Sequence, residues 1–139
     1  MTMKTIVVAV DESEPSQRAL ERAATLAKAF DSHLVVTSVV PANPGAVPRS
    51  IGTDPVESES DHRAELAAAR RYLEGESLSA EYVEAAGHEG QSIVAVAQEK
   101  SADLIVIGTR EPPLLVRLLG NAVSDTVTHH ARCDVLIVH

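Results

Sequence analysis

Residues 5–10 read TIVVAV, and the chain then passes through DESEPS, residues 11–16, into a helical pattern. A short continuous run of mostly β-branched apolar residues is typical of a strand that is buried on both faces. From Pro15 to Phe30 apolar residues recur at intervals of three and four, which predicts a helix with one buried face. Ser13 is the expected N-cap, because Glu14 and Pro15 both suit a first helical turn.

The same unit of strand and helix recurs along the rest of the chain. Further strands are predicted at residues 33–40, 79–85, 103–108 and 134–139, and further helices at 61–75, within 87–102, and at 122–131. Residues 41–60 hold four of the seven prolines and two of the seven glycines, which predicts a flexible surface loop. No internal repeat divides the chain, so residues 1–139 are expected to form a single domain.

Strands that alternate with helices predict an α/β fold. The expected architecture is an open five-stranded parallel sheet with helices on both faces, joined by right-handed crossovers. In such sheets ligands bind beyond the carboxyl ends of the strands, where the strand order reverses. Three segments are expected to meet there, namely Asp11 onward, residues 39–41, and Gly108 onward.

The composition excludes several partners. The net charge is −8, with 12 basic against 20 acidic residues, and such a surface repels nucleic acids. There is no apolar run of about 18 residues and no basic-then-apolar start, so neither a membrane span nor a signal peptide is expected. The single cysteine, Cys133, indicates a reducing cytoplasm and is expected to be a small buried hydrophobe. The histidines lack metal-ligand spacing, so no metal site is expected.

Enzymes and two other classes of α/β protein fit poorly. No G-x-x-x-x-G-K-[ST] motif is present, and no nucleophile with a base and an orienting group stands out. Aromatic residues make up only 2%, so few rings are available to stack on a flavin. A receiver domain of two-component signalling would need an Asp after the third strand and a Lys after the fifth, and the sequence supplies neither.

Three segments of the chain resemble the universal stress protein family: residues 6–27, 87–110 and 118–138. The similarity covers essentially the whole chain. It implies a Rossmann-like fold of the adenine nucleotide alpha hydrolase type, with strand order 3-2-1-4-5. It also implies a homodimer, often formed by the last strands pairing side by side, here Asp134–Val138. Many members of the family bind ATP, while another branch does not.

The family's nucleotide motif is G-x2-G-x9-G-[ST], beginning at the end of the fourth strand. Gly108 supplies the first glycine, but the second then falls on Glu111, and the last two positions fall on Asn121 and Ala122. A shift of one residue places Gly120 and Asn121 there instead, and an Asn amide can donate a hydrogen bond. A carboxylate beside phosphate is repulsive, so the loop is a degenerate version of the motif.

Pro112 and Pro113 weaken the loop further, because they offer no backbone N–H. Asp11 matches an acidic residue near the family's nucleotide, although it suits a helix cap equally well. Gly108 is expected to be glycine mainly because the backbone turns at the end of the strand. Arg110 is expected either to contact phosphate or to form an exposed ion pair. The resemblance implies that a bound nucleotide would lie against Ala9, Val10, Asp11, Val39, Val40, Gly108, Arg110, Gly120, Asn121, Ala122 and Val123.

Two functions remain open at this point. The first is a noncatalytic stress-response or regulatory homodimer whose nucleotide loop is degenerate. The second is an ATP- or AMP-binding switch of the same family, with ATP as the expected cofactor. Thermal stability with and without adenine nucleotides distinguishes the two.

Overall fold

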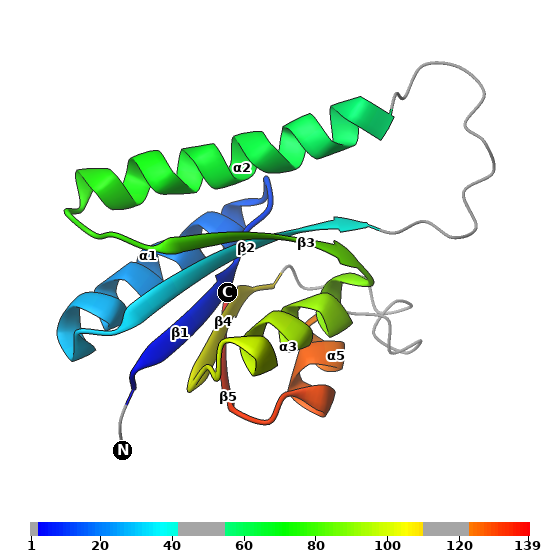
Figure 1. Cartoon of the computed structure of the whole chain (residues 1–139). Helices are drawn as coiled ribbons and strands as arrows, with labels where there is room; N and C mark the ends of the chain where they lie inside the picture. The colour runs from blue at the N-terminus through cyan, green and yellow to red at the C-terminus, as the bar shows by residue number, and fades with distance from the viewer. Residues whose placement is uncertain (1–2, 42–54, 110–122) are drawn as a thin grey trace.

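A computed structural model describes residues 3–41, 55–109 and 123–139 (Figure 1). The chain alternates between strand and helix in the order β1 (Thr5–Ala9), α1 (Glu14–Phe30), β2 (His33–Pro41), α2 (Pro55–Gly75), β3 (Glu81–Gly87), α3 (Glu89–Glu99), β4 (Leu104–Gly108), α5 (Val123–His130) and β5 (Asp134–Val138). All neighbouring strands pair in parallel, and the sheet order is β3-β2-β1-β4-β5. The predicted fold class and strand order are confirmed.

Helices cover both faces of the sheet (Figure 1). Ile6 and Val8 of β1 belong to a core cluster that includes residues of α1 and α2, whereas Val7 belongs to one that includes α3 and α5. Successive residues of a strand point to opposite faces, so a strand covered on both sides needs apolar residues at every position. This explains why residues 6–8 are all apolar and fully buried.

The start of α1 follows the sequence prediction. Ser13 is the N-cap, its hydroxyl oxygen accepts a hydrogen bond from the Ser16 amide at 3.3 Å, and a proline occupies the first turn. At the other end Asp31 adopts a left-handed conformation with φ 52°, and its amide donates to the Ala27 carbonyl. Both ends of the helix are therefore closed by local hydrogen bonds.

The predicted loop over residues 41–60 is too long at both ends. Pro41 is the last residue of β2, and α2 begins at Pro55 rather than at residue 61. Proline suits the first turn of a helix, where its missing N–H would have no intrahelical partner. The strand predicted at 79–85 also lies two residues later, at Glu81–Gly87. Residues 42–54 lie outside the described part of the chain.

The sheet has two edges, β3 and β5, within the described residues. The last strand pairs with β4 along one side, and Val135, Leu136 and Ile137 are half-buried. Arg18 of α1 donates to the carbonyl of His139 at 2.9 Å, which fixes the chain end beside α1. Within the described ranges, no helix combines the length and the apolar character needed to cross a bilayer.

Candidate functional site

The strand order reverses at β1, which lies between β2 and β4 in the sheet. The carboxyl ends of these three strands bring together Asp11, residues 39–41 and Gly108, as the sequence predicts. The Val10 amide donates to the Thr37 carbonyl at 2.9 Å, so the chain stays beside β2 as it leaves β1. This edge is therefore the crevice in which α/β proteins of this type bind ligands.

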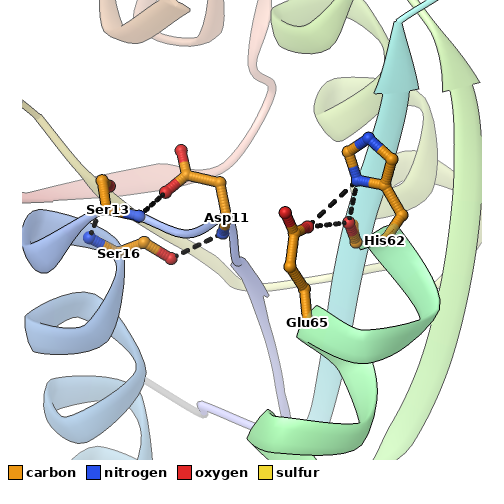
Figure 2. A network of polar contacts seen from close by, with 6 residues as sticks. Asp11, Ser13, Ser16, His62 and Glu65 are labelled. Carbon is orange, nitrogen blue, oxygen red and sulfur yellow. Dashed lines mark hydrogen bonds and ion pairs between the residues drawn. The ribbon is translucent and has the colours of Figure 1, made fainter. Parts of the chain in front are cut away.

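Asp11 belongs to a short network of turns ahead of α1 (Figure 2). Its Oδ1 accepts a hydrogen bond from the Ser13 amide at 2.7 Å, and its own amide donates to the Ser16 hydroxyl at 2.7 Å. The cap of α1 is Ser13, so Asp11 shapes the turn before the helix and is not itself the cap. Its side chain is exposed, and Oδ2 has no hydrogen-bond partner in the described part of the chain.

A cavity of about 320 Å³ lies beside this turn, between the start of α1 and the middle of α2. Its polar lining includes the carboxylates of Asp11, Glu12 and Glu65, and its apolar lining includes Val10 and Leu20. The described residues that line it are Val10, Asp11, Glu12, Ser13, Ser16, Gln17, Leu20, Ala64, Glu65, Ala68 and Ala69. Three of these described residues carry a carboxylate and none is basic, so this part of the lining is negatively charged.

A buried polar cluster joins α2 to β2 next to the cavity (Figure 2). The Ser38 hydroxyl donates to Glu65 Oε2 at 2.7 Å, and His62 Nδ1 lies 2.8 Å from the Ser38 hydroxyl and 3.0 Å from Glu65 Oε2. Ser38 is fully buried, and the side chains of His62 and Glu65 are 15% and 9% exposed. This cluster was not predicted; its signals were a serine within an apolar strand and a His–Glu pair three residues apart on a helix.

The cluster has the residue types of a hydrolase triad but not the geometry. In a triad the histidine receives the serine proton on one ring nitrogen and is held by the acid on the other. Here the serine and the glutamate both contact Nδ1 of His62. A fully buried serine also cannot reach a substrate. The arrangement anchors α2 to the sheet.

Glu89 adds a third negative side chain near Asp11 and Glu65. It occupies the first turn of α3, directly after β3 reaches the carboxyl edge of the sheet. Although the side chain is exposed, partial burial raises the pKa of its carboxyl above the ordinary value. Asp11 and then Glu65 raise the pKa further, whereas His62 lowers it.

Replacing Glu89 with Gln is expected to stabilise the protein at neutral pH. A carboxyl whose pKa is raised on folding contributes stability below its unfolded pKa, and this contribution is lost as the pH rises through the folded pKa. The amide mimics the neutral form, so the gain over wild type should be present at about pH 7 and vanish at about pH 4. Urea unfolding at both pH values measures it. A variant less stable than wild type at neutral pH would contradict this. It would show that the attraction between the Glu89 carboxylate and the N-terminus of α3 outweighs its repulsion by Asp11 and Glu65.

Gly108 has a different role from the one predicted. Among the described glycines only Gly87 has a positive φ, so the exit from β4 does not need glycine for a turn. A Cβ on Gly108 would instead overlap the carbonyl group of Pro15 and lie 2.7 Å from the Ser16 amide nitrogen. Glycine is required there because the start of α1 packs directly on the end of β4.

The remaining predicted site residues divide into two groups. Ala9 ends β1, Val10 and Val39 are buried, and Val40 is half-buried, all at the carboxyl edge. Val123 begins α5 and lines a second cavity of about 350 Å³ together with the first turn of α3. The predicted residues Arg110, Gly120, Asn121 and Ala122 lie outside the described residues, as do Glu111 and the two prolines.

Two further predictions concern ligand chemistry away from this edge. The described residues contain no group of three His, Cys, Asp or Glu that could hold a metal ion. Cys133 is half-buried, not fully buried, and packs against the core cluster on the α3 face. Burial raises the pKa of its thiol, and Asp134 and Asp103 add to the rise, which favours the less reactive neutral form.

Comparison with known proteins identifies the family. A model described as the universal stress protein family matches residues 2–139. This chain belongs to the universal stress protein family. It is 32% identical to universal stress protein MJ0531 of Methanocaldococcus jannaschii, over 97% of this chain and 81% of that protein.

Solved structures of universal stress proteins share the fold. One is a crystal structure of a universal stress protein in complex with cAMP, with a TM-score of 0.80, 26% identity, and coverage of 100% of this chain and 99% of the other. Another is the universal stress protein from Archaeoglobus fulgidus in complex with dAMP, with a TM-score of 0.69 and 26% identity over the whole of both chains. Both relatives therefore bind an adenine nucleotide with one phosphate.

Proposed function

We propose that this universal stress protein is a noncatalytic stress-response regulator that acts in the cytoplasm as a homodimer of single-domain subunits. The observation that carries the proposal is the polar cluster at the crevice. Ser38, His62 and Glu65 are the residue types of a hydrolase triad. However, Ser38 and Glu65 both contact Nδ1 of His62, and the Ser38 side chain is fully buried. Incubation with ATP should therefore release no phosphate above the buffer rate, and turnover would refute the noncatalytic reading.

The last strand supports the dimer. β5 is a sheet edge with three half-buried apolar residues, and such an edge is prone to pair with another strand. Sedimentation across a range of concentrations should give the mass of two chains. The Val138 carbonyl accepts from the Thr109 amide, so Val138 and Leu136 direct their backbone groups toward β4, whereas Val135 and Ile137 direct theirs to the open edge. Ile137→Pro removes one backbone donor from this open edge and should yield a monomer whose circular dichroism is unchanged. A wild-type monomer would contradict the dimer, and a variant dimer of unchanged stability would place the interface elsewhere.

An adenine-nucleotide switch is the second candidate function. It is favoured by the complexes of two related proteins with cAMP and dAMP. In this chain the carboxyl ends of β1 and β2 present Asp11 and the backbone of Val39 and Val40. The backbone groups and Asp11 suit an adenine or a ribose, whereas the carboxylates among the described residues lining the cavity oppose phosphate.

Thermal unfolding with added ligand tests this second candidate. Adenosine, AMP, cAMP, ADP and ATP should be compared with buffer, and the purified protein should be analysed for nucleotide retained from the cell. A ligand at a hundredfold excess over its Kd adds about 2.7 kcal/mol to the free energy of unfolding. No shift with any of the five compounds at millimolar concentration, and no retained adenine absorbance, would remove the nucleotide switch and leave the regulator without nucleotide.

A further inference from the structure

Ser38 of β2 is connected, through one side chain, to the helix that forms a wall of the cavity beside Asp11. We propose that Ser38 is a positioning residue for adenine-nucleotide binding, because through Glu65 it keeps α2 seated against the crevice. This role deepens the nucleotide-switch function and rests on it. Ser38 itself is not among the described residues that line the cavity.

The helix α2 is one of the walls of this cavity of about 320 Å³. The turn after β1 and the start of α1 form the opposite side. The residues that α2 contributes are Ala64, Glu65, Ala68 and Ala69, which share one face of the helix because they recur at intervals of three and four. A ligand that fills the cavity therefore loses contacts on one whole side whenever α2 leaves the sheet.

Two sets of contacts seat this wall on the sheet. Ala69 and Leu73 are buried in the core cluster that α2 shares with α1 and the strands. Closer to the N-terminus of the helix, Glu65 Oε2 accepts the Ser38 hydroxyl at 2.7 Å and lies 3.0 Å from His62 Nδ1. In Figure 2, Glu65 lies between His62, which it contacts, and Asp11, with which it shares the cavity.

Ser38 supplies the sheet's side of this polar connection. The serine is fully buried, and its hydroxyl also lies 2.8 Å from His62 Nδ1. An ion pair between Arg63 and Glu84 joins α2 to β3 as well, but it is 4.0 Å long and exposed, so it contributes little. Without the serine hydroxyl, the Glu65 side chain can turn into the cavity and this part of α2 can move away from β2.

Seating of α2 and occupation of the cavity are then thermodynamically linked. A ligand that binds only the seated form suppresses the opening of α2 by a factor of 1 + [ligand]/Kd. In return, the apparent affinity falls with the fraction of molecules in which α2 is seated. Local opening of this kind is measured by amide hydrogen exchange, separately from global unfolding.

Hydrogen exchange of the wild-type protein, followed by NMR, tests the first effect. Adenosine at a hundredfold excess over its Kd should slow the amides of residues 64–69 by about a hundredfold. The amides of residues 96–99 are the internal control, because they end α3 at the opposite edge of the sheet and should exchange through local fraying at an unchanged rate. Amides of α2 that exchange equally fast with and without bound adenosine would overturn the role of α2 as a wall.

Ser38→Ala tests the second effect. Loss of a hydrogen bond to a charged acceptor should speed exchange at residues 64–69 about tenfold or more in the absence of ligand. Calorimetry should show Kd values for adenosine and AMP that rise about two- to tenfold. Both ligands should shift by the same factor, since a displaced wall acts on the base and sugar that they share.

A matched pair of variants separates the hydroxyl from the shape of the side chain. Ser38→Thr keeps the hydroxyl, whereas Ser38→Val puts a methyl group in its place, so both share any crowding at this buried position. The threonine variant should bind adenosine about two- to tenfold more tightly than the valine variant. Val35→Ala is the control for stability, because Val35 is buried on the other face of the same strand, away from α2. It should lower global stability and leave the Kd unchanged.

Equal Kd values for the threonine and valine variants, or a wild-type Kd in Ser38→Ala, would overturn the role of Ser38 and leave nucleotide binding intact. A loss of affinity in Val35→Ala as large as that in Ser38→Ala would do the same, because general destabilisation would then explain both. No binding of adenosine or AMP by the wild-type protein would remove the nucleotide switch and this role with it.

Discussion

Gly108→Ala is expected to lower the free energy of unfolding by about 3 kcal/mol or more, at the upper end of the usual range for overpacking. The added methyl group would overlap the Pro15 carbonyl, and its nearest neighbours are backbone atoms of α1 that no side-chain rotation can move. Relief requires the whole start of α1 to shift away from β4, which also disturbs the turn at Asp11. Urea unfolding monitored by circular dichroism measures the loss.

Gly75→Ala is the matched control for this change. Gly75 is the last residue of α2, it is exposed, and nothing lies within 4 Å of the position that a Cβ would occupy. Alanine is the better helix former, so this variant should be as stable as wild type or up to about 1 kcal/mol more stable. Equal stability of the two variants would contradict the explanation that glycine is needed at position 108 because α1 packs closely on β4.

Gly108 also shows where sequence reasoning stops. The sequence placed this glycine correctly at the end of β4, because the β-branched run before it predicts a strand. It did not reveal that Pro15, 93 positions earlier in the chain, lies against it. A packing requirement between distant segments leaves no local pattern, so the glycine was assigned to a turn.

The strands and helices were more predictable than the site. A sheet covered on both faces needs unbroken apolar strands, and that pattern is visible in residues 5–10 and 103–108. The start of α2 was misplaced because Pro55 resembles a loop residue although proline also suits a first helical turn. The contacts of Ser38 with His62 and Glu65 join residues 24 and 27 positions apart, so they arise only when α2 packs on β2.

Glu65→Ala is expected to cost about 2 to 3 kcal/mol of unfolding free energy, because a hydrogen bond to a charged group is lost and its partners stay buried. The fully buried Ser38 hydroxyl would lose the Glu65 carboxylate as its acceptor and keep only its contact with His62 Nδ1, and His62 Nδ1 would lose one of its two contacts. Glu74→Ala, at an exposed position on the same helix, should change stability by less than about 0.5 kcal/mol. Urea unfolding of the three proteins measures both effects.

A double-mutant cycle with Ser38→Ala shows whether the cost comes from the hydrogen bond between Ser38 and Glu65. Once the serine is replaced, removal of Glu65 no longer breaks this hydrogen bond, so the double variant should lose about 1 kcal/mol less than the sum of the single losses. Strict additivity would mean that Glu65 acts alone, through its packing against α2 and the cavity. The coupled result would establish that this carboxylate fixes α2 to β2 through the hydrogen bond between the Ser38 hydroxyl and Glu65 Oε2, at the side of the cavity that Glu65 lines.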